Sequence, residues 1–283
     1  MTHIIAALAL AISFSSPAAF EAKVTGHGRA MILIPGLSAG AETWDTTVEH
    51  FKDRFECHVL TVAGFAGVPR VPAPMLDRVV DDLAAYIRER HLDKPVVVGH
   101  SLGGFVALRL ASKYPDLPGR IVSVDGYANY LRLTGAPSSP EQAKASADMI
   151  RQNMGRMTAD AYEAYVKSGV STRMMVSRDS DFEMLVRWGL ASDRTAVGDA
   201  LAEMFESDLR PELAKITTPT MVLAAWKSYE QYTDHDRHMK ALHDQFDTLP
   251  RVRLELNDTA RHFIMWDDPQ WMFSRMDAFL DGK

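Results

Sequence analysis

The chain has 283 residues, of which 47% are hydrophobic and 24% charged, a globular composition that excludes collagen-like, coiled-coil and disordered chains. A chain of this length can fold around one large core without metal ions or disulfide bonds. Thirty-one lysine and arginine residues against 37 aspartate and glutamate residues give a net charge of −6. Because no basic block is present that could neutralise a row of phosphates, we expect no nucleic acid partner.

An apolar run from Ile4 to Phe14 is followed by small residues at positions 16–18. The run has the length of a signal-peptide core and is too short to span a bilayer. We therefore expect residues 1–22 to be a signal peptide, export to the periplasm or the medium, and no stable membrane insertion. No lysine or arginine precedes the run, which leaves an alternative: a strand or helix packed on the domain of a cytoplasmic protein.

Short β-branched apolar runs alternate with amphipathic stretches from about residue 28 onward. The runs predict buried strands at residues 30–34, 57–62, 95–99, 121–124, 218–226 and 252–256. The amphipathic stretches predict helices at residues 77–91, 102–113, 234–245 and 269–280. This alternation is typical of an α/β fold with a doubly wound, mostly parallel central sheet. The one cysteine, Cys57, falls in a predicted strand, where we expect a small buried apolar residue rather than a nucleophile.

The strand rhythm stops after Gly126 and resumes near residue 218. The intervening chain begins with the breaker-rich stretch 135–140 and continues as helical segments rich in methionine. We predict one α/β core domain formed by residues 23–126 and 207–283, interrupted by a helical cap insertion at residues 127–206. The insertion forms either the core of a small helical layer or the roof of a binding site, and flexible thioethers suit an adaptable apolar pocket.

The sequence Gly99-His100-Ser101-Leu102-Gly103 places a G-x-S-x-G motif between a predicted strand and a predicted helix. At such a turn the serine is held out from the backbone, and the glycines allow close chain approach. The start of the helix also directs unpaired N–H groups toward a developing oxyanion, the first of them from Leu102. The position of the motif predicts that Ser101 is a nucleophile.

At this motif the chain resembles the α/β-hydrolase fold family, in its serine esterase and lipase branch, from about Gly28 to the C-terminus. A serine at this turn argues against the dehalogenase and epoxide-hydrolase branches, which use aspartate there. The loop at residues 34–38 stands where the family has its oxyanion loop, and Trp44 follows as a bulky residue often does. The resemblance implies that the backbone N–H of Leu37 is the second oxyanion donor. Pro35 departs from the common histidine of this loop, but the donor is a backbone group.

The sequence Arg261-His262-Phe263, followed by Asp267-Asp268-Pro269 and an apolar helix, resembles the C-terminal histidine loop of the family. We predict that His262 is the general base, because serine alone is a weak nucleophile near neutral pH. His100 adjoins Ser101, but neighbours at such a turn point apart. We therefore expect His100 to line the substrate pocket.

The acid of the predicted triad is less well defined by the sequence. Many family members carry it after the strand that here ends near Trp226, yet the next carboxylate is Glu230. Asp125 ends an earlier strand on the same sheet edge as the serine, where it could orient His262. We predict Asp125 as the acid, with Glu230 and Asp234 as alternatives, although an aspartate at a strand end also serves as a turn cap.

The charged segment after residue 233 holds the one cluster with possible metal-ligand spacing, formed by Asp234, His235, His238 and His243. Apolar residues recur along this segment, and we interpret it as a solvated helix with one buried stripe. The proposed chemistry requires neither a metal nor another cofactor. The aromatic residues expected to line the pocket together with His100 are Tyr127, Tyr130, Trp188 and Trp226.

The sequence thus predicts a serine hydrolase that cleaves carboxylic esters of small molecules with an apolar portion, through an acyl-enzyme on a Ser-His-Asp triad. The same triad could instead cleave a carbon-carbon bond or a lactone, or form peracids. A ligand-binding protein on a hydrolase scaffold, without turnover, is the alternative from another class. The oligomeric state is left open.

Overall fold

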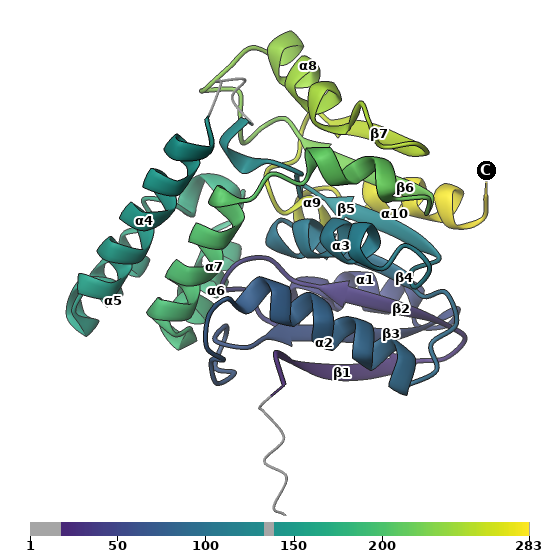
Figure 1. Ribbon diagram of the computed structural model, residues 1–283, viewed down its shortest axis with the longest axis horizontal. Helices are drawn as coiled ribbons and strands as arrows, with labels where there is room; N and C mark the ends of the chain where they lie inside the picture. Colours follow the sequence, from purple (N-terminus) through teal and green to yellow (C-terminus); the bar gives the residue numbers. More distant parts are fainter. Residues whose placement is uncertain (1–17, 133–138, 283) are drawn as a thin grey trace, which may run out of the picture.

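A computed structural model describes residues 18–132 and 139–282. Seven strands form one sheet in the order β1-β3-β2-β4-β5-β6-β7 (Figure 1). Their bounds are β1 Phe20–Gly26, β2 Arg29–Ile34, β3 Phe55–Val62, β4 Val96–His100, β5 Arg120–Val124, β6 Thr220–Ala225 and β7 Val252–Asn257. Only β1 runs antiparallel to its neighbour, and the other pairs are parallel. The predicted α/β fold with a mostly parallel sheet is confirmed.

Helices cover both faces of the sheet, because alternate side chains of each strand point to opposite faces. Ile32 and Ile34 join the hydrophobic cluster under α2, α3 and α8, whereas Met31 and Leu33 join the cluster under α1, α9 and α10. The bounds of these helices are α1 Asp45–Phe51, α2 Met75–Glu89, α3 Leu102–Lys113, α8 His235–Phe246, α9 Ile264–Asp267 and α10 Pro269–Leu280. Cys57 is fully buried, and burial raises the pKa of its thiol to about 11.

In the described part of the chain between β5 and β6, four α-helices lie in the segment predicted as a helical insertion. They are α4 Pro140–Arg156, α5 Ala159–Ser168, α6 Asp179–Ala191 and α7 Arg194–Glu206, and they form a layer beside the sheet (Figure 1). The N–H of Asp193 donates to the carbonyl of Gly64 at 2.8 Å, so the layer packs on a loop at the carboxyl end of β3. Met154 is buried, but Met149 and Met174 are 60% and 40% exposed. The methionines of the insertion therefore differ widely in exposure.

The N-terminal part of the chain differs from the expected boundary. β1 begins at Phe20 and pairs with β3 from its first residue, so cleavage at the expected end of a leader, residue 22, would remove the start of a strand. Ala19 is also held, because its N–H donates to Asp82 at 2.9 Å. The apolar run of the expected leader lies outside the described residues. In the part of the chain that the structure describes, no helix has the length and apolarity needed to cross a bilayer.

Candidate active site

Ser101 stands at the sharp turn between β4 and α3. Its backbone has φ 53° and ψ −119°, a conformation that L residues rarely adopt and that holds the side chain out from the turn. A Cβ on Gly99 would lie 2.0 Å from the carbonyl oxygen of Gly103, and a Cβ on Gly103 would lie 2.2 Å from that of Ile34. The glycines of the motif are therefore required by close backbone approach.

The loop after β2 lies over this turn. A Cβ on Gly36 would come within 3.3 Å of Ser101 Cβ and within 3.0 Å of His100 Nδ1. Leu37 follows in the same loop, and Leu102 opens α3. Within residues 18–132 and 139–282, neither of these two backbone N–H groups has a hydrogen-bond acceptor. Both amides are therefore available to an oxygen bound next to the serine.

Asp125 follows β5 and faces His262 across the sheet edge. Its Oδ2 lies 2.5 Å from Nδ1 of His262, and its carboxylate is completely buried. Its Oδ1 accepts the backbone N–H of Ala225 at 2.9 Å and the hydroxyl of Tyr127. Because both oxygens are occupied by donors, the orientation of the carboxylate is determined.

The main chain of His262 is held from two sides. Its N–H donates to Oγ of Ser228 at 2.9 Å, and its carbonyl accepts from Nε2 of His100 at 3.0 Å. Since Nδ1 of His262 donates to Asp125, Nε2 is left with its lone pair free to accept a proton. Both Ser101 and His262 are less than a tenth exposed, so the two side chains lie in a site shielded from bulk water.

The alternative acids point elsewhere. Glu230 pairs with Lys227 at 2.7 Å, and Asp234 caps α8 by accepting the N–H of Arg237 at 2.9 Å. Of the three candidate acids, Asp125 is therefore the one that contacts His262. In the described part of the chain, no group of three histidine, cysteine, aspartate or glutamate side chains is arranged to hold a metal ion.

His100 and Trp226, expected in the pocket, pack against protein groups. The His100 ring lies 4.4 Å from Phe263 and 6.5 Å from Trp44, measured between centroids, and burial lowers its pKa well below the usual value. It therefore supports the His262 loop. The Trp226 ring packs against His238 of α8 at 5.5 Å.

Tyr127, Trp188 and Tyr130 lie nearer to the predicted machinery. Tyr127 is fully buried and donates to Asp125, whereas the expectation was a pocket wall. Trp188 of α6 is 3% exposed, and its Nε1 would lie 2.9 Å from a Cβ on Gly40, just beyond the oxyanion loop. The Tyr130 ring lies 5.8 Å from that of Tyr127 between centroids, and its buried hydroxyl has no hydrogen-bond partner in the described part of the chain.

Two serines were missed by sequence reasoning. Ser228 precedes His262 by 34 residues, and Ser192 joins the oxyanion loop to the helical layer through a 2.8 Å hydrogen bond from the Ser38 hydroxyl. Neither residue belongs to a local motif. Their roles depend on loops that meet only in the folded chain, so the sequence carried no signal for them.

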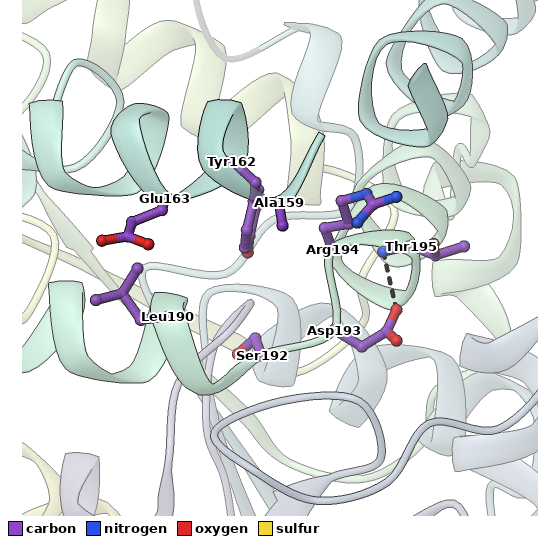
Figure 2. Close-up of a pocket in the computed structure, with 8 residues that line it drawn as sticks. All are labelled: Ala159, Tyr162, Glu163, Leu190, Ser192, Asp193, Arg194 and Thr195. Atoms are coloured by element: carbon purple, nitrogen blue, oxygen red, sulfur yellow. Dashed lines mark hydrogen bonds between the residues drawn. The ribbon is translucent and has the colours of Figure 1, made fainter. Parts of the chain in front are cut away.

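A cavity of about 600 Å³ lies within the helical layer. Figure 2 shows that its walls come from α5 and from the junction of α6 and α7. They include Tyr162, Leu190, Ser192 and Arg194. None of the predicted catalytic residues lines this cavity, and Ser192 is the link between its wall and the oxyanion loop.

The pattern of one family, described as the alpha/beta hydrolase family, matches residues 31–275. The chain belongs to the α/β hydrolase family. A solved structure of a thermophilic esterase from Thermogutta terrifontis superposes on this α/β hydrolase with a TM-score of 0.73, covering 93% of both chains at 21% identity. At that identity the likeness shows the fold.

Two relatives are similar to this α/β hydrolase over most of their length. N-formylmaleamate deformylase of Pseudomonas putida is 26% identical over 260 residues, which cover 90% of each chain. Pimeloyl-acyl-carrier-protein methyl ester esterase of Nitrosomonas europaea is 24% identical over 92% of this chain and 99% of its own. Both relatives are hydrolases, so the similarity supports hydrolase activity, while the bonds named for the two proteins differ.

Proposed function

We propose that this protein is a serine hydrolase that cleaves carboxylic esters of small molecules through an acyl-enzyme. The observation that carries the proposal is the 2.5 Å contact between Nδ1 of His262 and Oδ2 of Asp125, at the same sheet edge as the strained Ser101. Serine needs a base whose own orientation is held by a third group, and this contact supplies that orientation.

In the first half of the reaction, Nε2 of His262 removes the proton of Ser101 as Oγ attacks the ester carbonyl. The carbonyl oxygen becomes negatively charged and is held by the N–H groups of Leu37 and Leu102. His262, now an imidazolium, is stabilised by the ionised Asp125. It then gives its proton to the departing alcohol, which leaves Ser101 acylated.

In the second half, water enters in place of the alcohol. His262 removes a proton from this water as it attacks the acyl carbonyl, and the same two amides hold the new oxyanion. The tetrahedral intermediate collapses with return of the proton to Ser101 Oγ. The acid is released and the resting enzyme is restored, so the cycle consumes one water and no cofactor.

The test is a Ser101→Ala variant assayed with a short-chain p-nitrophenyl ester. Because the alanine retains the amides and the histidine but lacks the nucleophile, turnover should fall by roughly 10³-fold or more. A fluorophosphonate should label the wild-type protein at Ser101 and leave the folded variant unlabelled. Retained turnover by the variant would refute the mechanism, and a wild type that turns over nothing and takes no label would favour a ligand-binding protein.

A second candidate is hydrolysis of a carbon-nitrogen bond, as in removal of an N-formyl group. The observation that favours it is the similarity to a deformylase over 90% of both chains. The same nucleophile, base and amides serve both reactions, and the difference lies in the leaving group. Parallel kcat/KM measurements on a methyl ester and on the matching N-formyl amide decide between them, the larger value identifying the bond for which the site is built.

A further inference from the structure

The carboxylate of Asp125 accepts a hydrogen bond from the Tyr127 side chain, which the proposed triad does not require. Its Oδ2 faces His262, and its Oδ1 accepts both the N–H of Ala225 and the phenolic hydroxyl of Tyr127. The amide is part of the backbone that ends β6, so it is present whatever the side chain. The phenol, in contrast, depends on a tyrosine at position 127. Its hydrogen bond is expected to be strong, because hydrogen bonds to an ionised carboxylate are stronger than those between neutral groups.

The ring of Tyr127 is fixed by its neighbours. It is completely buried and meets the rings of Tyr130 and Tyr229 edge-on, at centroid distances of 5.8 and 6.4 Å. Burial, together with the nearby charge of Asp125, raises the pKa of the Tyr127 phenol well above its usual value. The hydroxyl therefore keeps its proton and acts as a donor to the carboxylate.

We propose that Tyr127 is a positioning residue that shares the charge of Asp125 with His262 and thereby limits how strongly the carboxylate holds the protonated imidazole. The inference rests on the proposed function, since it concerns the acid and base of the triad. A carboxylate with fewer donors carries a less compensated charge and attracts an imidazolium more strongly. Removal of the phenol should therefore keep His262 protonated, and thus inactive as a base, up to a higher pH.

The other histidines and tyrosines around this pair are neutral near pH 7. His100 lies 4.5 Å from His262 between ring centroids, and His238 of α8 stacks on Tyr229 at 4.6 Å. Burial lowers the pKa of both histidines and raises the pKa of Tyr130 and Tyr229. The adjoining cation, Arg261, donates to the carbonyl of Met174 at 3.0 Å. A change near neutrality therefore reports on Asp125 and His262.

The first experiment compares the pH dependence of kcat/KM in wild type and Tyr127→Phe, from about pH 5 to pH 9. Phenylalanine keeps the ring and removes the hydroxyl. The midpoint of the acidic limb should rise by roughly 0.5–1 pH unit, since one unit corresponds to about 1.4 kcal/mol of differential interaction. Tyr86→Phe is the matched control, because the Tyr86 hydroxyl forms a 2.8 Å hydrogen bond with Nδ1 of His58, remote from the triad. The acidic limb of this variant should stay at its wild-type position.

A second variant keeps the proposal testable if Tyr127→Phe does not fold. A ring-fluorinated tyrosine placed at position 127 keeps the packing and is a stronger donor, so the acidic limb should shift to lower pH. Opposite shifts in the two variants support charge sharing, because a purely structural role would lower activity without moving the limb in a direction set by donor strength. An acidic limb that stays in place in both variants would overturn the proposal.

A spectroscopic measurement separates this proposal from the triad itself. Proton NMR of Ser101→Ala requires no turnover. In this variant the proton between Asp125 and His262 should give a strongly downfield imidazole resonance. That resonance should be absent after a further His262→Gln change. Adding Tyr127→Phe should move that resonance. Its absence from folded Ser101→Ala protein would contradict the triad, whereas a resonance that is present but unmoved by the loss of the phenol would contradict the role of Tyr127 alone.

Discussion

Two residues of the site hold backbone conformations that side chains normally avoid. Ser101 has φ 53° and Asp125 has φ 49°, both in the left-handed half of conformational space. They directly follow the neighbouring strands β4 and β5, and the N–H of Ser101 donates to the carbonyl of Val124 at 2.9 Å. A Cβ on Gly126 would lie 2.7 Å from the carbonyl oxygen of Ser101. Close packing of the two turns maintains the strain and aims both side chains at the sheet edge.

Asp125→Asn tests the acid at the scale of one residue. The amide has nearly the shape of the carboxylate, but it carries no charge to stabilise an imidazolium and favours the wrong tautomer of His262. We expect kcat to fall by roughly 10³–10⁴-fold, with the fold retained by circular dichroism. Glu230→Gln, which alters an exposed ion pair with Lys227, should leave kcat unchanged. Equal losses in the two variants would contradict the assignment of Asp125.

At the scale of elements, the junction of α6 and α7 is joined to the oxyanion loop by one buried hydroxyl. Oγ of Ser192 accepts from the Ser38 hydroxyl at 2.8 Å and from the N–H of Ala66 at 2.9 Å, and it donates to the carbonyl of Trp188 at 2.8 Å. Ser38 directly follows Leu37 and has φ 61°. The position of the Leu37 amide therefore depends on the helical layer.

Ser192→Ala should loosen this connection. The lost hydrogen bonds leave the Ala66 amide unpaired, so we expect the free energy of unfolding to fall by about 1–2 kcal/mol in urea titrations. Because the oxyanion loop is less well held, kcat should fall by roughly tenfold. Ser112→Ala is the control, since that hydroxyl bonds a carbonyl in its own helix and its loss should leave kcat intact. A destabilised Ser192 variant with wild-type kcat would show that the connection is purely structural.

At the scale of the molecule, the helical layer and the sheet domain meet through a buried carboxylate. Glu203 of α7 accepts the N–H groups of Met75 and Leu76, both at 2.8 Å, at the first turn of α2. Burial raises the pKa of Glu203 above its ordinary value, because the charged form loses its hydration. The ionised state is therefore less favourable in the folded protein than in the unfolded chain.

The sign of the pH effect follows from this shift. A carboxyl whose pKa is raised on folding adds stability below its unfolded value, near pH 4.5, and that stability is lost as the pH rises through the folded value. Glu203→Gln cannot titrate, so the stability advantage of wild type over this variant should be larger near pH 4 than near pH 7. Urea unfolding at both pH values measures it, with exposed Glu183→Gln as the control. An advantage that grows toward neutral pH would contradict the prediction.

The same sheet domain also shows which elements local sequence predicts well. The buried central strands and the long amphipathic helices were predicted within a few residues, because burial on both faces gives continuous apolar runs and one-sided burial gives helical spacing. β1 and the short α1 were not predicted. β1 is an edge strand with mostly exposed residues, and α1 spans only seven residues, so neither carries a strong apolar period.

The sequence alone determined the family resemblance, the α/β fold and the candidate nucleophile, because each depends on a local pattern: apolar periodicity, or a glycine-flanked serine between a strand and a helix. Only the tertiary structure shows that Asp125, rather than Glu230 or Asp234, contacts His262, since Asp125 and His262 are 137 residues apart. The same holds for Tyr127, whose hydroxyl donates to Asp125. Which polar atoms meet across neighbouring strands is decided by packing, and local sequence does not encode it.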